Sequence, residues 1–140
     1  MLIFIDDKDP RPLYQQIAAQ VKDQVQRGDV RPGDELPSVR ELAENLGINL
    51  HTVRNAYLKL RDQGVIDLRL GRRARIARQR AAGVTTAEAE LALGAQVREL
   101  VADAYLLGLS NEELHELLNR HSGRGNPGRT TKDSHTEDRY

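Results

Sequence analysis

The chain has 140 residues, with 21 basic and 21 acidic side chains and therefore no net charge at pH 7. That length suits one small domain with an appendage. Cysteine is absent, which excludes disulfide bonds and thiolate metal sites, and no stretch approaches the ~20 apolar residues of a membrane helix. Residues 2–5 are apolar but lack the basic start and the length of a signal peptide, so we expect a cytoplasmic protein with no membrane partner.

The first predicted helix runs from Pro12 to about Arg27. Proline suits the first turn of a helix. Apolar residues then recur every four positions and form one stripe: Leu13, Ile17, Val21 and Val25. Residues 28–33 are interpreted as a loop, and residues 2–5 as an extended segment that packs on this domain or on a partner subunit.

Two short helices joined by a tight turn are predicted between residues 38 and 62. Ser38 can cap the first helix, and Glu41 three residues later completes a capping box. Gly47 ends that helix in the left-handed conformation that glycine adopts at low cost, and Asn49 caps the second helix. Both helices carry an apolar face, formed by Val39, Leu42, Ala43 and Leu46 and then by Val53, Ala56, Tyr57 and Leu60. This pattern is typical of a helix-turn-helix, whose second helix enters the major groove of DNA.

The opposite face of the second helix is polar. Its side chains crowd the first two turns, which enter the groove first in helix-turn-helix docking. They are His51, Thr52, Arg54, Asn55 and, further along, Lys59. An ordinary solvated helix face is the alternative, but the caps, the turn glycine and the hairpin that follows favour DNA recognition.

A basic hairpin, or wing, is predicted over residues 65–78. Residues 65–70 and 74–78 would form its strands, with Gly71 at the tip. Residues 64–83 hold six arginines against one aspartate, a net charge of +5. Such a tip suits contacts to phosphates or to a narrow minor groove.

At this point the residues resemble the GntR family of bacterial transcription regulators. The matching motifs are PLYQQI at 12–17, PGDELPSVRELA at 32–43, Asn49 with TVR at 52–54 and Ala56-Tyr57, and Gly64 with the wing. The resemblance covers roughly residues 10–78. The short C-terminal segment is similar to the YtrA-type branch, which carries a small two-helix dimerisation region in place of a large effector domain.

The resemblance implies which residues contact DNA. It points to Arg40 in the first helix of the motif, to the start of the second helix and to the wing-tip glycine. The full predicted set is Ser38, Arg40, Asn49, His51, Thr52, Arg54, Asn55, Gly71, Arg72 and Arg73. Two positions depart from the family pattern: Arg73 stands where a second glycine is usual, and Leu50 stands where polar or basic residues are frequent. These departures leave the wing geometry and the operator sequence open.

The C-terminal part is predicted to form two amphipathic helices. Residues 84–121 hold two arginines against seven acids, a net charge of −5, which places the nucleic-acid surface at the winged end. Gly108 breaks the first helix, and Ser110 with Glu113 forms a capping box for the second. These helices either fold back on their own winged domain or pair with the same helices of a second chain. The resemblance and the preference of oligomers for two-fold symmetry favour pairing. The predicted dimer interface is Leu93, Val97, Leu100, Ala104, Leu107, Leu114, Leu117 and Leu118.

The predicted fold is mainly α with a small β-hairpin. Residues 1–80 form a winged helix-turn-helix domain, with the helix-turn-helix at about 38–62 and the wing at about 65–78. Residues 84–121 form a helical dimerisation region. Residues 122–140 have no aliphatic side chain and are expected to be a disordered tail.

The predicted function is a homodimeric regulator of transcription, a repressor that binds a pseudo-palindromic site on double-stranded DNA. We expect no enzymatic activity, no cofactor and no metal. One alternative is a regulator that senses a metal or an effector through its C-terminal region, although His115 and His121 do not share one clean helical face. Another is a winged helix used for protein contacts, which would leave the wing arginines without a partner. The effector, the operator and the sign of regulation stay open.

Overall fold

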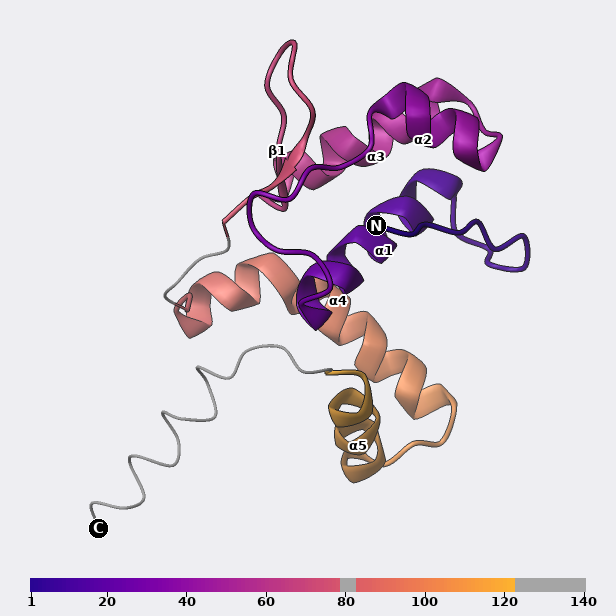
Figure 1. Cartoon of the computed structure of the whole chain (residues 1–140). Helices are drawn as coiled ribbons and strands as arrows, with labels where there is room; N and C mark the ends of the chain where they lie inside the picture. The colour runs from indigo at the N-terminus through magenta and orange to yellow at the C-terminus, as the bar shows by residue number, and fades with distance from the viewer. Residues whose placement is uncertain (79–82, 123–140) are drawn as a thin grey trace. The chain divides into compact units, whose positions relative to one another are not determined.

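The computed structural model describes residues 1–78 and 83–122, which fall into two units that are described separately. The first unit contains α1 (Leu13–Arg27), α2 (Val39–Leu46), α3 (Leu50–Asp62), β1 (Ile66–Asp67) and β2 (Arg75–Ile76) (Figure 1). The second contains α4 (Thr86–Leu106) and α5 (Asn111–His121). The mainly helical fold with one small antiparallel sheet confirms the predicted fold class. The predicted tail, from residue 123 onward, lies outside the described residues.

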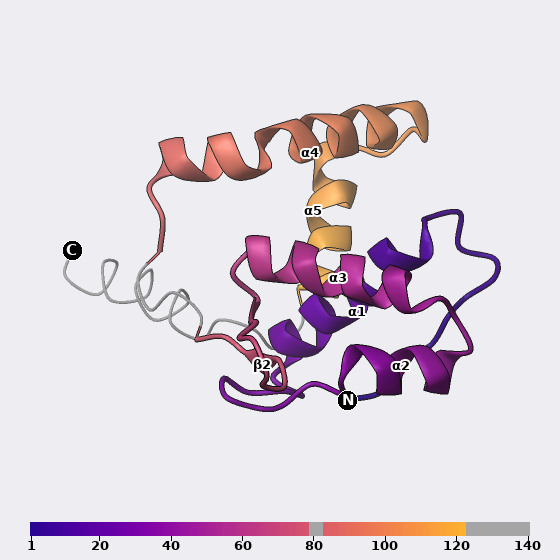
Figure 2. The same ribbon diagram turned by 90° about the horizontal axis from the view of Figure 1, so that it is seen from above.

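The core of the first unit lies around α3, against which both α1 and α2 pack. The inward side chains are those that the helical spacing predicts, because an apolar face must leave water to stabilise so small a domain. Fully buried among them are Ile17, Val21, Val53, Tyr57 and Leu60. Figure 2 shows the sharp change of direction between α2 and α3.

The predicted caps of the helix-turn-helix are confirmed. The Ser38 hydroxyl accepts a hydrogen bond from the Glu41 amide at 3.1 Å, and the Glu41 carboxylate accepts one from the Ser38 amide at 3.3 Å. Gly47 takes the left-handed conformation with φ 65°, and the Asn49 side chain accepts from the His51 amide at 2.8 Å. These contacts fix where α2 ends and at what angle α3 begins.

The wing has much shorter strands than the sequence predicts. Only Ile66 and Asp67 pair with Ile76 and Arg75, so residues 68–74 form a long loop that extends from the base of the hairpin (Figure 1). Leu70 is fully exposed in this loop. Leu68 and Ala74, next to the paired residues, still pack on the core, so apolar contact with the core ends before the tip of the loop.

A segment ahead of α2 completes the base of the wing. Residues 33–36 run along the free edge of β2. The Gly33 amide donates to the Ile76 carbonyl at 2.8 Å, and the Leu36 amide donates to the Ala74 carbonyl at 2.8 Å. The wing is thus joined both to the chain that enters the helix-turn-helix and to the chain that leaves it.

The N-terminal segment packs on α1, which is one of the two options that the sequence leaves open. Three glutamines spaced four residues apart on α1 bond to alternate residues of the segment. The Gln20 side chain accepts from the Phe4 amide and donates to its carbonyl, and the Gln24 side chain donates to the Leu2 carbonyl. Gln16 completes this glutamine ladder through both backbone groups of Asp6.

The second unit consists of two capped helices. Thr85 with Glu88 and Ser110 with Glu113 form capping boxes, of which the sequence predicted the second. α4 ends at Leu106, just before Gly108, which has φ 79°. Of the predicted dimer interface, Ala104 and Leu114 are buried within the single chain, whereas three residues of α4 and its C-cap Leu107 remain 41–78 % exposed; the three are Leu93, Val97 and Leu100. None of the described helices is both long and apolar enough to cross a bilayer.

Candidate nucleic-acid interface

The predicted DNA-contacting residues lie on the solvent side of the first unit. Val53, Ala56 and Tyr57 turn the apolar face of α3 inward, so the intervening residues face outward. His51, Arg54 and Asn55 are exposed, and Thr52 is half-buried. The start of α3 therefore presents an imidazole, a guanidinium and an amide, which are groups that bond to base edges and phosphates.

Five of the other predicted residues line two surface depressions, and the sixth, Asn49, is exposed at the cap of α3. Arg40 and Leu50 line one of about 470 Å³ at the turn between α2 and α3. Ser38 lines a second one of about 320 Å³ together with Gly71, Arg72 and Arg73. The beginning of α2 and the tip of the wing thus form a single surface, as contact with neighbouring phosphates would require.

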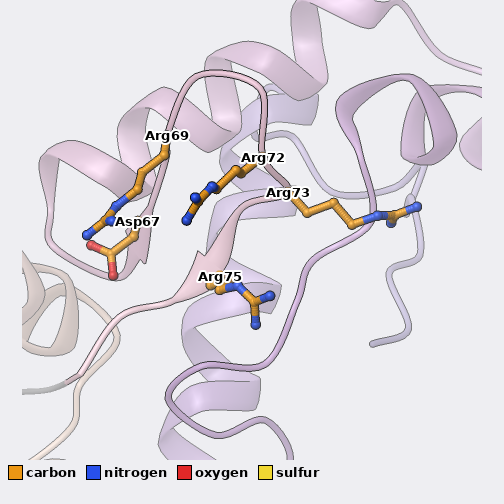
Figure 3. Close-up of a pocket in the computed structure, with 5 residues that line it drawn as sticks. All are labelled: Asp67, Arg69, Arg72, Arg73 and Arg75. Atoms are coloured by element: carbon orange, nitrogen blue, oxygen red, sulfur yellow. The ribbon is translucent and has the colours of Figure 1, made fainter.

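A third depression lies on the wing itself. It has a volume of about 250 Å³, and its lining side chains are Asp67, Arg69, Arg72, Arg73 and Arg75. Figure 3 shows Arg69 and Arg72 on the same side as Asp67, whereas the end of the Arg73 side chain points away from them. Within residues 1–78 and 83–122, Arg69 and Arg72 form no ion pair. Their charges remain available to an anion.

The other two wing arginines are paired with acids from the chain around α2. Arg73 donates to both carboxylate oxygens of Glu41, at 2.9 and 2.5 Å. Arg75 donates to the Glu35 carboxylate at 2.7 Å and to the Gly33 carbonyl at 2.9 Å. The bonds from Arg73, followed by the bond from the Ser38 amide, lower the pKa of Glu41, so its carboxylate stays ionised at neutral pH.

A tyrosine ties α3 to the start of α2. The Tyr57 hydroxyl donates to the Pro37 carbonyl at 2.6 Å, and the residue is only 1 % exposed. Burial, and secondarily the nearby charge of Glu41, raises the pKa of Tyr57 above its ordinary value. The hydroxyl therefore stays protonated and acts as a donor over the physiological range.

Some residues of this surface were not identified from the sequence. Arg69 and Arg75 are counted in the basic charge of the wing but not assigned to the site. Glu35 and Glu41 are not recognised from the sequence as the partners of Arg75 and Arg73. In the longer strand that the sequence predicts, residues 73 and 75 would share one side, which is the signal that could have suggested acidic partners on that side. Lys59, from the polar face of α3, lies 5.5 Å from the centre of the Tyr14 ring. Among the described residues no group of three or more His, Asp or Glu side chains could hold a metal ion.

This arrangement of a capped helix-turn-helix, an outward polar face on its second helix and a basic wing defines a winged-helix DNA-binding domain. A model of the family of bacterial regulatory proteins named gntR matches residues 13–76. The transcriptional repressor YtrA of Bacillus subtilis strain 168 is 37 % identical over 118 residues, which cover 84 % of this chain and 89 % of that protein.

Solved structures agree with this relationship. A transcriptional antiterminator from Listeria monocytogenes EGD-e has a TM-score of 0.77 and 31 % identity, covering 87 % of this chain and 90 % of its own. YtrA from Sulfolobus acidocaldarius, a GntR-family transcription factor, has a TM-score of 0.58 and 33 % identity, covering 76 % of this chain and 99 % of its own. The chain belongs to the GntR family, and it is a DNA-binding regulator of transcription.

Proposed function

We propose that this protein is a homodimeric repressor that occupies a pseudo-palindromic operator and thereby excludes RNA polymerase. The exposed apolar face of α4, in a chain whose other unit is a DNA-binding domain, is the observation that carries the proposal. YtrA of Bacillus subtilis, which is similar to this chain along most of its length, is a repressor. This similarity supports repression rather than activation.

In the proposed complex the start of α3 reads bases in the major groove. Arg54 would bond to a guanine edge, a role that its exposure supports, and His51 and Asn55 are exposed on the same helix. Asn49 and Thr52 are further candidates at this end of the helix. Ser38 and Arg40 on α2 would contact the phosphate backbone, while Gly71 and Arg72 bring the wing to the adjacent groove.

The dimer is proposed to form through α4 and α5. The apolar positions of α4 alternate spacings of four and three, which is the repeat of paired helices. The exposed members are Leu93, Val97, Leu100 and Leu107, joined by Leu117 and Leu118 of α5, whose exposures are 38 and 47 %. A second copy of the same surface would remove these side chains from water. Two-fold symmetry would then present two α3 helices to two half-sites.

The experiment that tests the function is selection of bound sequences from a random duplex pool. We expect an inverted repeat to be enriched, and binding to weaken steeply with salt because each subunit adds phosphate contacts. Placing the enriched site over a promoter in a purified transcription system should then lower transcript yield. Enrichment of a single half-site by a monomer, or an increase in transcript yield, would refute the proposal.

A further inference from the structure

The contact between Arg73 and Glu41 joins the loop of the wing to the first helix of the helix-turn-helix. The two residues are 32 positions apart in the chain. Both guanidinium Nη atoms of Arg73 donate to Glu41, one to each carboxylate oxygen. Glu41 is held in turn because it also closes the capping box with Ser38 at the start of α2. Arg73 is thus bound to a carboxylate whose own position is fixed.

The loop of the wing packs on the core through Leu68 and Ala74, and a bond from the Arg72 amide to the Arg69 carbonyl at 3.1 Å closes its turn, but no backbone bond joins the tip to α2 among the described residues. β1 and β2 pair over two residues each, and the bonds from residues 33–36 reach no further along the returning strand than Ala74. Arg73 is the next residue toward the tip. Its side chain therefore extends the support of the wing by one position, in the direction of Gly71 and Arg72.

The same geometry makes Arg73 a poor cation for DNA. Its charge is matched by that of Glu41, and both of its Nη atoms already have acceptors. A phosphate could take these two N–H groups only by displacing Glu41, and one that used the three remaining N–H groups would lie near the Glu41 carboxylate, whose charge opposes it. Arg69 and Arg72 have no such partner among the described residues.

We propose that Arg73 is a positioning residue, which holds the wing against α2 through Glu41 so that Arg69 and Arg72 meet the phosphates while α3 occupies the major groove. The inference rests on the proposed mode of DNA binding. Arg73 stands where a second glycine is usual in the wing of this family. The inference gives this arginine the role of keeping the wing ordered in the free protein. A wing already ordered before binding loses less conformational entropy in the complex.

The test is a double-mutant cycle on affinity for the duplex enriched by the parent protein. Glu41→Gln keeps the capping box, since glutamine serves at that position, but removes the charge that binds Arg73. Glu41→Gln and Arg73→Gln should each weaken binding by about two- to fivefold, the range of an exposed ion pair, and the double variant should bind no more weakly than either. Arg73→Lys should bind as weakly as Arg73→Gln, because lysine keeps the charge but loses the fork.

The salt dependence distinguishes positioning from direct contact. Arg73→Gln should leave the slope of log affinity against log salt unchanged, whereas Arg72→Gln should reduce it by about 1. Hydrogen exchange of the amides of residues 68–72 in the free protein should quicken in both Glu41→Gln and Arg73→Gln, with the melting temperature unchanged. Arg27→Gln, which breaks an exposed ion pair with Asp23 on α1, is the control for charge and should change neither affinity nor exchange.

Two results would overturn the positioning role. One is a reduced salt slope in Arg73→Gln together with unchanged or tighter binding by Glu41→Gln. The other is an additive loss in the double variant. Failure of the parent itself to enrich any duplex would instead refute the proposed function, so the two failures are distinguishable.

Discussion

The hydroxyl of Tyr57 is expected to stabilise the helix-turn-helix, and Tyr57→Phe removes it while keeping the ring. The lost interaction is one neutral hydrogen bond of 2.6 Å to the Pro37 carbonyl. Such a bond contributes about 0.5–1.5 kcal/mol net. Pro37 is half-buried, so water can reach its carbonyl in the variant and no acceptor is left fully unsatisfied. We therefore expect a loss of ~1 kcal/mol in the free energy of unfolding.

Urea denaturation followed by circular dichroism measures this loss. A change of ~1 kcal/mol corresponds to about 4–8 °C in melting temperature for a domain of 60–100 residues. Tyr105→Phe is the matched control, because Tyr105 on α4 is 80 % exposed and should lose its hydroxyl without effect. Equal stability of Tyr57→Phe and Tyr105→Phe would refute the reasoning that this hydrogen bond ties α3 to α2.

The same tyrosine predicts a dependence on alkaline pH. The pKa of Tyr57 is raised in the folded state, mainly by burial, from an ordinary value of 10.0. Its contribution to stability is therefore complete below pH 10 and is lost as pH rises further, because only the unfolded state releases the proton easily. The stability advantage of the parent over Tyr57→Phe should shrink above pH 10 in the same urea titrations. A constant difference between pH 8 and 11 would contradict the assigned burial effect.

The remaining predictions concern DNA, assembly and the N-terminus. Arg54→Ala should cost about 1–3 kcal/mol in operator binding and relax the preference at one base position, as competition with single-base variants would show. Equal affinity for all competitors in the parent and the variant would remove α3 from the recognition role. Leu100→Asp should halve the mass seen in sedimentation, because it buries a charge at each copy of the paired surface; an unchanged mass would exclude this interface. Gln20→Ala should speed hydrogen exchange at the Phe4 amide, which would otherwise be protected by the glutamine ladder. Unchanged exchange there would mean that Gln20 does not hold the segment.

The parts of the fold that the sequence predicted are those that local chemistry determines. Capping boxes join residues three positions apart, and a left-handed glycine acts at its own position. The capping roles of Ser38, Gly47 and Asn49 can therefore be predicted from the local sequence alone. The apolar spacing likewise predicts the buried side chains of α3, and in α1 it predicts Ile17 and Val21 but misses Gln16 and Ala18. The exposed polar start of α3 follows from the same periodicity.

The parts that the sequence did not predict depend on contacts between distant residues. The side chain of Gln24 reaches Leu2 across 22 positions, and Arg73 reaches Glu41 across 32. In the sequence, a glutamine at every fourth residue of a helix looks like an ordinary polar face. Its role becomes visible only when the fold places the N-terminal segment beside α1. The strands of the wing are shorter than predicted because apolar contact with the core ends at Leu68 and Ala74, and Leu70 is fully exposed. Ala104 and Leu114 of the predicted interface are already buried in the single chain, and the interface itself stays a prediction.

The bond between the Leu36 amide and the Ala74 carbonyl has a consequence for protein engineering. The chain enters the helix-turn-helix at Leu36 and returns from the tip of the wing at Ala74, and the two residues are hydrogen-bonded. Residues 36–74 therefore form a closed loop with adjoining ends. Such a loop can be exchanged between relatives at two neighbouring junctions without altering the distance between them. A chimera that keeps α1, α4 and α5 of this protein but receives residues 36–74 from another regulator should adopt the donor's sequence preference. Because α1 packs on α3, the buried α3 side chains, Val53 and Leu60 among them, are the ones that must be matched for the exchange to fold.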